Sequence, residues 1–257
     1  MTTQSTDQGW HSGTGDPART VELLWGLREP SRRGPKQRLT VPQIAEAAIA
    51  LADGEGLAAL SMRRVAERLG VTAMSLYTYV PSKAELVDVM LDTVLGELPS
   101  TVVPGGWRAR LERVARDKWD LYLRHPWLLQ VATSRPPMGP NLMARYEYEL
   151  GAVEGTGLPD VAMDLVVTLV GDYVHGAARA AVAAAQIQQR SGMSDAQWWE
   201  GYAPLLAQVL DADKYPVASR VGTAAGEAFD APSDPERAFE FGLERVLDGV
   251  EALITGS

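Results

Sequence analysis

The sequence predicts an all-α protein, and three observations carry that prediction. Apolar side chains recur at helical spacings of three and four residues along most of the 257-residue chain. Residues suited to cap a helix N-terminus precede several of these segments. No segment shows the strict alternation of apolar and polar residues that marks a half-buried strand. With 46% hydrophobic residues, the chain can bury a sizeable core.

The front of the chain contains four short predicted helices, and each has its own start and stop signals. The expected N-caps are Thr40, Ser61, Thr72 and Ser82, with capping-box partners Gln43 for the first and Glu85 for the last. The expected stops are Gly54, Gly70, Pro81 and Pro99.

The rear of the chain has longer predicted helices, at 105–124, 126–133, 140–154, 159–187, 195–210 and 235–254. Loops are expected at 134–139, 188–194 and 211–234. The chain therefore divides into a flexible extension with a basic arm (1–38), a helix-turn-helix domain of three helices (39–98) and a larger helical domain (99–257).

Charge and composition narrow the classes of function. The chain has no Cys, which excludes disulfides, thiolate nucleophiles and Cys-ligated metals. Its net charge is −9, yet residues 31–83 carry 8 basic against 4 acidic side chains, so the front can hold a polyanion locally. Asp164 and Asp172 interrupt the most apolar helix, and we expect no membrane span and a cytoplasmic protein.

Residues 61–80 are the most informative segment. A short amphipathic helix ends at Gly70, and a capped helix follows two residues later, which is the spacing of a helix-turn-helix. Ala66 is small enough for the two helices to pack closely, and the second helix would enter a major groove. The alternative is two ordinary helices of a bundle, in which Leu76 points inward equally well.

Side chains of this motif match the chemistry of base edges and phosphates. The candidate DNA-binding residues are Arg63, Thr72, Ala73, Met74, Ser75, Tyr77, Thr78, Tyr79 and Lys83. Ahead of the motif, a basic arm would follow the DNA backbone or enter the minor groove, and its candidates are Arg32, Arg33, Lys36 and Arg38. The alternative for the arm is a solvated linker.

The stretch from Leu39 to Leu91, LTVPQIAEAAIALADGEGLAALSMRRVAERLGVTAMSLYTYVPSKAELVDVML, resembles the N-terminal domain of tetracycline-repressor (TetR) family regulators. The most specific part is LGV…LYTYV.SK..L, in which Lys83 is the lysine after the recognition helix. In the rear, SRP at 134–136, HGA at 175–177, YAPLLAQVL at 202–210 and FEFGLERVLDGVEAL at 239–253 resemble the ligand-binding domain of the tetracycline-repressor class.

This resemblance implies an all-α homodimer in which helices 159–187 and 235–254 pair across the dimer. The alanines of 177–185 would let helices approach closely, and the last helix carries an apolar stripe. The members of this stripe are Phe239, Leu243, Val246, Val250 and Ile254. The alternative is that these faces pack within one subunit.

Helix 159–187 carries one narrow polar line, formed by Asp164, Thr168, Asp172, His175 and Arg179. The line would project into a ligand cavity or form a solvent-facing edge, and the resemblance favours the cavity for Thr168 and Asp172. The resemblance adds Arg113, Asp117, Val131, Ser134, Tyr146 and Glu149, and His175 completes the candidate ligand-binding residues.

Two positions depart from the tetracycline-repressor pattern. Val131 stands where that class places a metal-binding histidine, and Pro99 stands at another pocket histidine. A magnesium–tetracycline complex is therefore a poor candidate effector, and we expect no metal and no cofactor.

The hypothesis that follows is a ligand-responsive DNA-binding transcriptional regulator, a homodimer that a small molecule releases from double-stranded operator DNA. The sequence lacks a nucleophile elbow, a phosphate loop and an HExxH motif, so an enzyme is not expected. The runner-up is a helical small-molecule-binding or enzymatic protein whose front no longer binds DNA.

Overall fold

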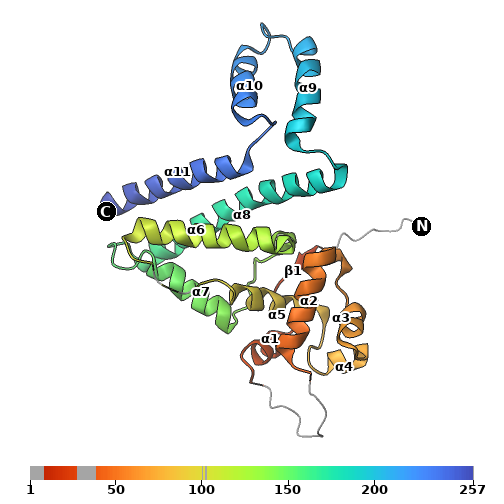
Figure 1. Cartoon of the computed structure of the whole chain (residues 1–257). Helices are drawn as coiled ribbons and strands as arrows, with labels where there is room; N and C mark the ends of the chain where they lie inside the picture. The colour runs from red at the N-terminus through yellow and green to blue at the C-terminus, as the bar shows by residue number, and fades with distance from the viewer. Residues whose placement is uncertain (1–8, 28–38, 100, 102, 257) are drawn as a thin grey trace, which may run out of the picture.

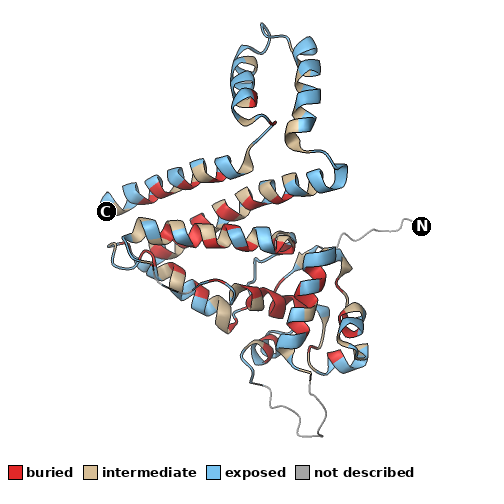
Figure 2. Cartoon of the chain, viewed as in Figure 1, coloured by how far each residue is buried: buried red, intermediate tan, exposed pale blue. Residues whose placement is uncertain are grey.

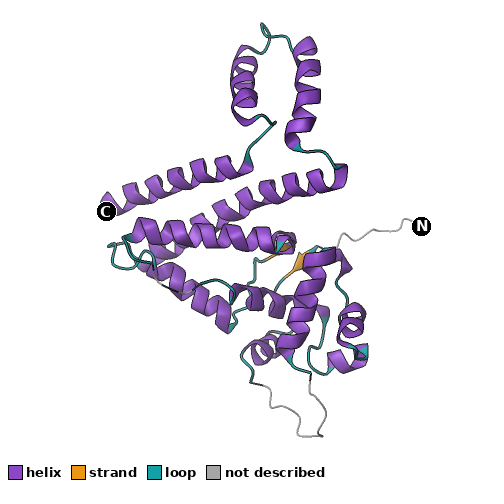
Figure 3. Cartoon of the chain, viewed as in Figure 1, coloured by secondary structure: helices purple, strands orange, loops and turns teal. Residues whose placement is uncertain are grey.

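The protein's structure, a computed structural model, describes residues 9–27, 39–99, 101 and 103–256. Most of these residues lie in helices, which confirms the all-α prediction (Figures 1 and 3). The helices are α1 (Pro17–Leu24), α2 (Val41–Glu55), α3 (Met62–Leu69), α4 (Ala73–Tyr77), α5 (Lys83–Leu95), α6 (Trp107–Arg124), α7 (Pro140–Gly151), α8 (Asp160–Ser191), α9 (Asp195–Val209), α10 (Pro216–Phe229) and α11 (Pro235–Thr255). Two 3-10 helices, η1 (Leu57–Ala59) and η2 (Pro126–Gln130), and two strands, β1 (Trp10–His11) and β2 (Val131–Ala132), complete the described elements.

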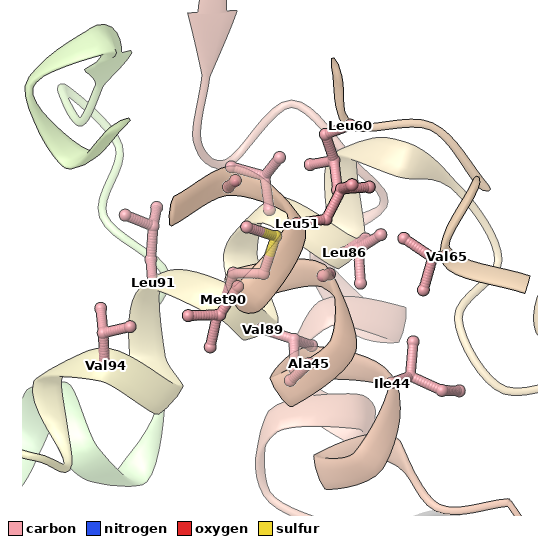
Figure 4. Packing of buried hydrophobic residues seen from close by; sticks show 14 of the residues in the cluster. Ile44, Ala45, Leu51, Leu60, Val65, Leu86, Val89, Met90, Leu91 and Val94 are labelled. Carbon is pink, nitrogen blue, oxygen red and sulfur yellow. The ribbon is translucent and has the colours of Figure 1, made fainter. Parts of the chain in front are cut away.

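The front half is built from α2 to α5 around a buried apolar cluster (Figures 2 and 4). Ile44 of α2, Val65 of α3 and Met90 of α5 meet in it. All four expected N-caps are present, because the side chains of Thr40, Ser61, Thr72 and Ser82 each accept a backbone N–H of the following turn. The four N-caps and the Thr40–Gln43 capping box are thus confirmed. The expected capping box of Ser82 with Glu85 is wrong, because the Glu85 carboxylate accepts from the Ser82 hydroxyl, and α5 ends at Leu95, ahead of Pro99.

The rear half packs α6, α7, α8 and α11 around a second apolar cluster. Trp119 of α6 stacks on Phe239 of α11 with ring centroids 4.2 Å apart, and the valines of α8 lie beneath them. Both α6 and α11 pack against α8, the 32-residue helix at the centre of this half (Figure 1).

A hairpin of α9 and α10 projects from this body (Figure 1). The expected loop at 211–234 is wrong over α10, which runs from Pro216 to Phe229 and is rich in glycine and alanine. Gly226 faces the Trp199 indole so closely that a Cβ there would lie 2.8 Å from the ring. Gly226 therefore lets the Trp199 ring pack directly on α10.

The expectation of a flexible N-terminal extension is wrong for residues 9–27. Strand β1 pairs in parallel with β2, and the Ser12 hydroxyl donates to the backbone carbonyls of Ala132 and Arg135. Helix α1 packs against α5, and the Trp25 indole N–H donates to the Met138 carbonyl at 2.8 Å. We name residues 9–27 the N-terminal strap, because they contact both halves of the molecule.

Three buried carboxylates on α5 accept backbone N–H groups from neighbouring segments. Glu85 accepts the N–H of Asp16 and Asp88 accepts that of Gly13, at 3.3 and 3.0 Å, so both hold the strap. Asp92 accepts the N–H of Leu142 at 2.9 Å, in the first turn of α7, where a negative charge also complements the helix dipole. Helix α5 is thereby joined to the strap and to the rear half.

Replacing Asp88 with Asn is expected to make the protein more stable at pH 8 and to leave its stability at pH 4 nearly unchanged. Burial, and secondarily Glu85, raise the pKa of Asp88 to about 6 from 3.8. The unfolded state therefore loses its proton at lower pH than the folded state, and the native protein loses stability as the pH rises from about 4 to 6. Thermal unfolding across this range measures the effect; an equal shift at both pH values would contradict it.

By length and composition alone, α8 is apolar enough to cross a membrane, although Asp164 and Asp172 lie within it. The core helix of a soluble protein passes the same test. In α8, 33% of the most apolar 18-residue window is buried inside this chain. The helix presents apolar residues on two sides, of which one faces α6 and α11 while the other is exposed at Val161, Leu165 and Leu169.

Candidate functional site

Helices α3 and α4 form a helix-turn-helix. Gly70 ends α3 in the left-handed conformation, with φ at +67°, and its N–H returns to the carbonyl of Glu67. Thr72 then caps α4, and Leu76 is fully buried against the front core. This anchoring fixes one face of α4 inward and leaves the other on the surface.

The exposed face of α4 carries five of the predicted residues: Thr72, Met74, Ser75, Tyr77 and Thr78. The hydroxyls within it are already engaged, since those of Thr72 and Ser75 lie 3.0 Å apart and Thr78 donates to the Ser75 carbonyl. Met74, 76% exposed, and Tyr77, 43% exposed, are therefore the large side chains free to reach a partner.

The other predicted residues of this surface differ in availability. Ala73 and Tyr79 are half-buried against the front core. Arg63 is exposed beside Glu67, at an Nε–Oε1 distance of 3.2 Å. The Lys83 Nζ lies 3.6 Å from the centroid of the Trp10 ring, and partial burial lowers the pKa of this ammonium group. The candidates of the basic arm, Arg32, Arg33, Lys36 and Arg38, lie outside the described residues.

In the rear half, three predicted ligand residues join a buried ionic network between α6 and α7. Arg113 pairs with Asp117 at 2.7 Å, and Glu149 accepts from both Lys118, at 2.8 Å, and Arg145, at 2.7 Å. Arg145, Glu149 and Asp117 are each at least 94% buried. Sequence reasoning missed Arg145 and Lys118; the spacing of four between Arg145 and Glu149 on α7 was an available signal.

A cavity of about 410 Å³ opens beside this network, between the start of α6 and the end of α7. None of the nine predicted ligand residues lines it, although Glu147 and Tyr148 of its wall are sequence neighbours of Tyr146 and Glu149. Arg110, one helical turn before Arg113, also lines it, and its buried Nε has no hydrogen-bond partner among the described residues. The remaining wall is formed by Val103, Ala144, Gly151 and Ala152.

The remaining predicted ligand residues are dispersed. Val131 is buried in β2, in the front core, and Ser134 is exposed in the loop after it. The Tyr146 hydroxyl donates to Asp164 at 2.7 Å, and this bond raises the pKa of the phenol. Thr168 and Asp172 are exposed on α8.

His175 meets Tyr122 edge-on, with ring centroids 5.6 Å apart. Burial, followed by the charges of Glu149 and Asp172, raises the pKa of Tyr122 to about 12. The polar line of α8 thus divides: Asp164 and His175 turn toward α7 and α6, whereas Thr168 and Asp172 face outward in this single chain.

The predicted apolar stripe of the last helix packs mainly within the subunit. Phe239, Leu243 and Val250 are buried with α8, while Val246 and Ile254 are half-buried against the same cluster. An additional exposed apolar line remains on α8, at Val161, Leu165 and Leu169.

Two family models match the chain. Residues 37–90 match the model described as "Bacterial regulatory proteins, tetR family", and residues 99–254 match "Tetracyclin repressor-like, C-terminal domain". The second match alone covers more than half of the chain.

Similar proteins include a named repressor. The chain is 46% identical to the HTH-type transcriptional repressor DrrR1 of Streptomyces coeruleorubidus over 246 residues, 95% of this chain and 88% of that protein. It is 27% identical to the class A tetracycline repressor from transposon 1721 of Escherichia coli over 218 residues, 80% of this chain and 88% of that protein. Among solved structures, ActR of Streptomyces coelicolor in complex with actinorhodin superposes with a TM-score of 0.70 and 30% identity, over 84% of this chain and 97% of that one.

Proposed function

The chain belongs to the TetR family of bacterial regulatory proteins, and from this membership we propose how it reads DNA and responds to a ligand. It is a DNA-binding transcriptional repressor whose DNA binding responds to a small molecule. The observation that carries the proposal is α4, a capped helix anchored by Leu76 that presents Met74 and Tyr77 to the surface. A repressor of this kind acts in the cytoplasm, where the operator DNA is.

In this proposal α4 lies in the major groove, and its side chains divide the work. Met74 contacts a thymine methyl group, and Tyr77 reaches a base edge or a phosphate. Arg63 and Lys83 flank the helix and contact phosphates. The hydroxyls of Thr72, Ser75 and Thr78 are committed within α4, so they orient the helix and contribute less to base reading.

We propose a homodimer, with the exposed line of α8 as the centre of its interface. A helix that is apolar on opposite faces needs cover on both, and α8 has cover on only one face in a single chain. The small residues Gly176 and Ala180 continue this face and allow a second α8 to approach closely. Two copies would then present two α4 helices to one operator.

Replacing Leu165 with Glu is expected to convert the dimer into a monomer, because it buries a carboxylate in an apolar interface. Sedimentation velocity measures the change in mass. Met74→Glu places the same charge on an exposed apolar site of the front half and is the matched control, which stays dimeric. A dimeric Leu165→Glu protein would place the interface elsewhere.

We propose that the effector enters the cavity between α6 and α7. The wall is largely apolar with one tyrosine ring, and Arg110 and Glu147 add single charges of opposite sign, which favours an aromatic compound with polar substituents. ActR has been solved in complex with actinorhodin and with (S)-DNPA, so compounds of this size are sensible probes. Beside the cavity, the first turn of α7 is hydrogen-bonded to Asp92 of α5. Through this contact, effector binding at α7 would move α5 and with it α4.

Ala144→Trp is expected to abolish effector binding while preserving DNA binding, because an indole at this wall position fills the cavity. The experiment is a thermal-shift screen of aromatic compounds, including actinorhodin, followed by DNA release with each compound that binds. Ala58→Trp, on the exposed surface of the front half, is the matched control. Compounds that still bind Ala144→Trp would place the effector site elsewhere, and binders that leave DNA affinity unchanged would show that this half is not the switch.

A further inference from the structure

The N-terminal strap places an aromatic ring on a predicted DNA contact. The Lys83 Nζ lies 3.6 Å from the centroid of the Trp10 ring, within the range of a strong cation–π contact. Lys83 is the first residue of α5, immediately after the segment that leaves α4. Among the described residues no carboxylate forms an ion pair with Lys83, so its ammonium group interacts there with the Trp10 ring.

This contact restrains a side chain that is otherwise free. A free lysine side chain loses rotamer entropy when it is fixed, and that loss weakens any phosphate contact it makes. The Trp10 ring occupies one side of the ammonium group, and Lys83 remains exposed, so N–H donors stay available to a phosphate. A lysine held in place before DNA arrives binds with a smaller entropic loss.

The position of Trp10 is set by segment 131–138, which follows α6 and η2 and whose Val131 packs into the front core. Trp10 pairs with Val131 in the β1–β2 ladder, and Ser12 adds hydroxyl bonds to the carbonyls of Ala132 and Arg135. At the other end of the strap, Trp25 is bonded to Met138. A chain of contacts therefore runs from segment 131–138 through the strap to Lys83, in addition to the link that α5 provides.

We propose that Trp10 is a positioning residue for the DNA contact of Lys83, and that the strap transmits the position of segment 131–138 to that contact. The inference rests on the proposed function only in taking Lys83 as a phosphate contact. Residues 9–27 lie outside both segments that match the family models, 37–90 and 99–254, so family membership assigns them no role.

The test is a thermodynamic cycle on the full-length protein. Fluorescence anisotropy with DNA from upstream of the protein's own gene measures affinity for wild type, Trp10→Ala, Lys83→Ala and the double variant, at several salt concentrations. Trp10→Ala is expected to weaken binding by about 3- to 10-fold. The same change made in the Lys83→Ala background is expected to have no further effect, because Trp10 acts through the lysine.

Three further variants separate positioning from loss of structure. Trp10→Phe keeps a ring face and is expected to restore most of the affinity. Ser12→Ala removes the two hydroxyl bonds to Ala132 and Arg135 and leaves the backbone pairing of β1 in place. It is expected to cause a smaller loss that also disappears in the Lys83→Ala background. His11→Ala alters the neighbouring strand residue, whose imidazole makes no hydrogen bond within the described part of the chain, and should match wild type.

Two results would overturn the inference. The first is a DNA affinity of Trp10→Ala equal to or tighter than that of the wild type. The second is a Trp10→Ala loss of affinity that is the same in the wild-type and Lys83→Ala backgrounds. If one of these results is found and Lys83→Ala still weakens binding, Trp10 has no positioning role, and the proposed function stands. A wild-type protein that fails to bind the DNA would remove both.

Discussion

Tyr77→Ala is expected to weaken operator binding by about 1–3 kcal/mol, or roughly 5- to 150-fold, while binding to random DNA changes far less. Tyr77 is exposed on α4, and its hydroxyl makes no hydrogen bond within the described residues, so its truncation leaves the helix cap and the buried Leu76 intact. A base contact contributes to specificity, whereas phosphate contacts contribute equally to every sequence. The ratio of the two affinities, measured by anisotropy at fixed salt, is therefore the quantity that should fall.

Tyr215→Ala is the matched control for this change. Tyr215 is exposed to a similar extent, 47% against 43%, but lies at the start of α10, far along the chain from the helix-turn-helix. Its truncation should leave both affinities unchanged. If Tyr77→Ala lowers operator and random binding by the same factor, Tyr77 contacts phosphate and base reading belongs to another residue of α4.

Arg145→Ala is expected to lower the free energy of unfolding by about 3–5 kcal/mol, the largest stability effect that we predict. Its guanidinium bonds Glu149 at 2.7 Å and the Val114 carbonyl at 3.3 Å, and it lies 3.9 Å from Asp117. Without it, two buried carboxylates depend on Lys118 and the half-exposed Arg113 alone. Urea unfolding measures the loss.

Glu149→Gln in the Arg145→Ala background should recover part of that stability, because it removes one of the uncompensated charges. Arg245→Ala on α11 is the control: its ion pairs with Glu244 and Asp248 are exposed, and such pairs contribute little, about 0–1 kcal/mol. Equal losses for Arg145→Ala and Arg245→Ala would show that the buried network does not stabilise the rear half.

Much of the front half could be predicted because its signals are local. The caps at Thr40, Ser61, Thr72 and Ser82 act within three residues, and Gly70 marks its turn by a backbone conformation that favours glycine. Local chemistry of this kind is readable in one sequence without any knowledge of distant partners.

What could not be predicted depends on contacts between distant segments. Trp10 contacts Lys83, 73 residues away in the sequence, and pairs with Val131, 121 residues away. No local sequence pattern predicts contacts over such separations. The cavity is likewise lined from two helices far apart in the chain: the family resemblance pointed to Arg113 and Tyr146, while the walls are formed by Arg110 and Tyr148. Helix α10 was missed because it is rich in glycine and alanine, and the contact of Gly226 with the Trp199 ring joins two different helices.

The measurement that tests the account most directly is footprinting of the full-length protein on DNA upstream of its own gene. A dimer with two α4 helices predicts two protected half-sites centred one helical turn, about 34–36 Å, or a multiple of it apart. Tyr77→Ala should need roughly 5- to 150-fold more protein than the wild type to give the same protection. A footprint that Tyr77→Ala leaves unchanged, or no protection of any sequence by the wild type, would contradict the claim that α4 reads an operator.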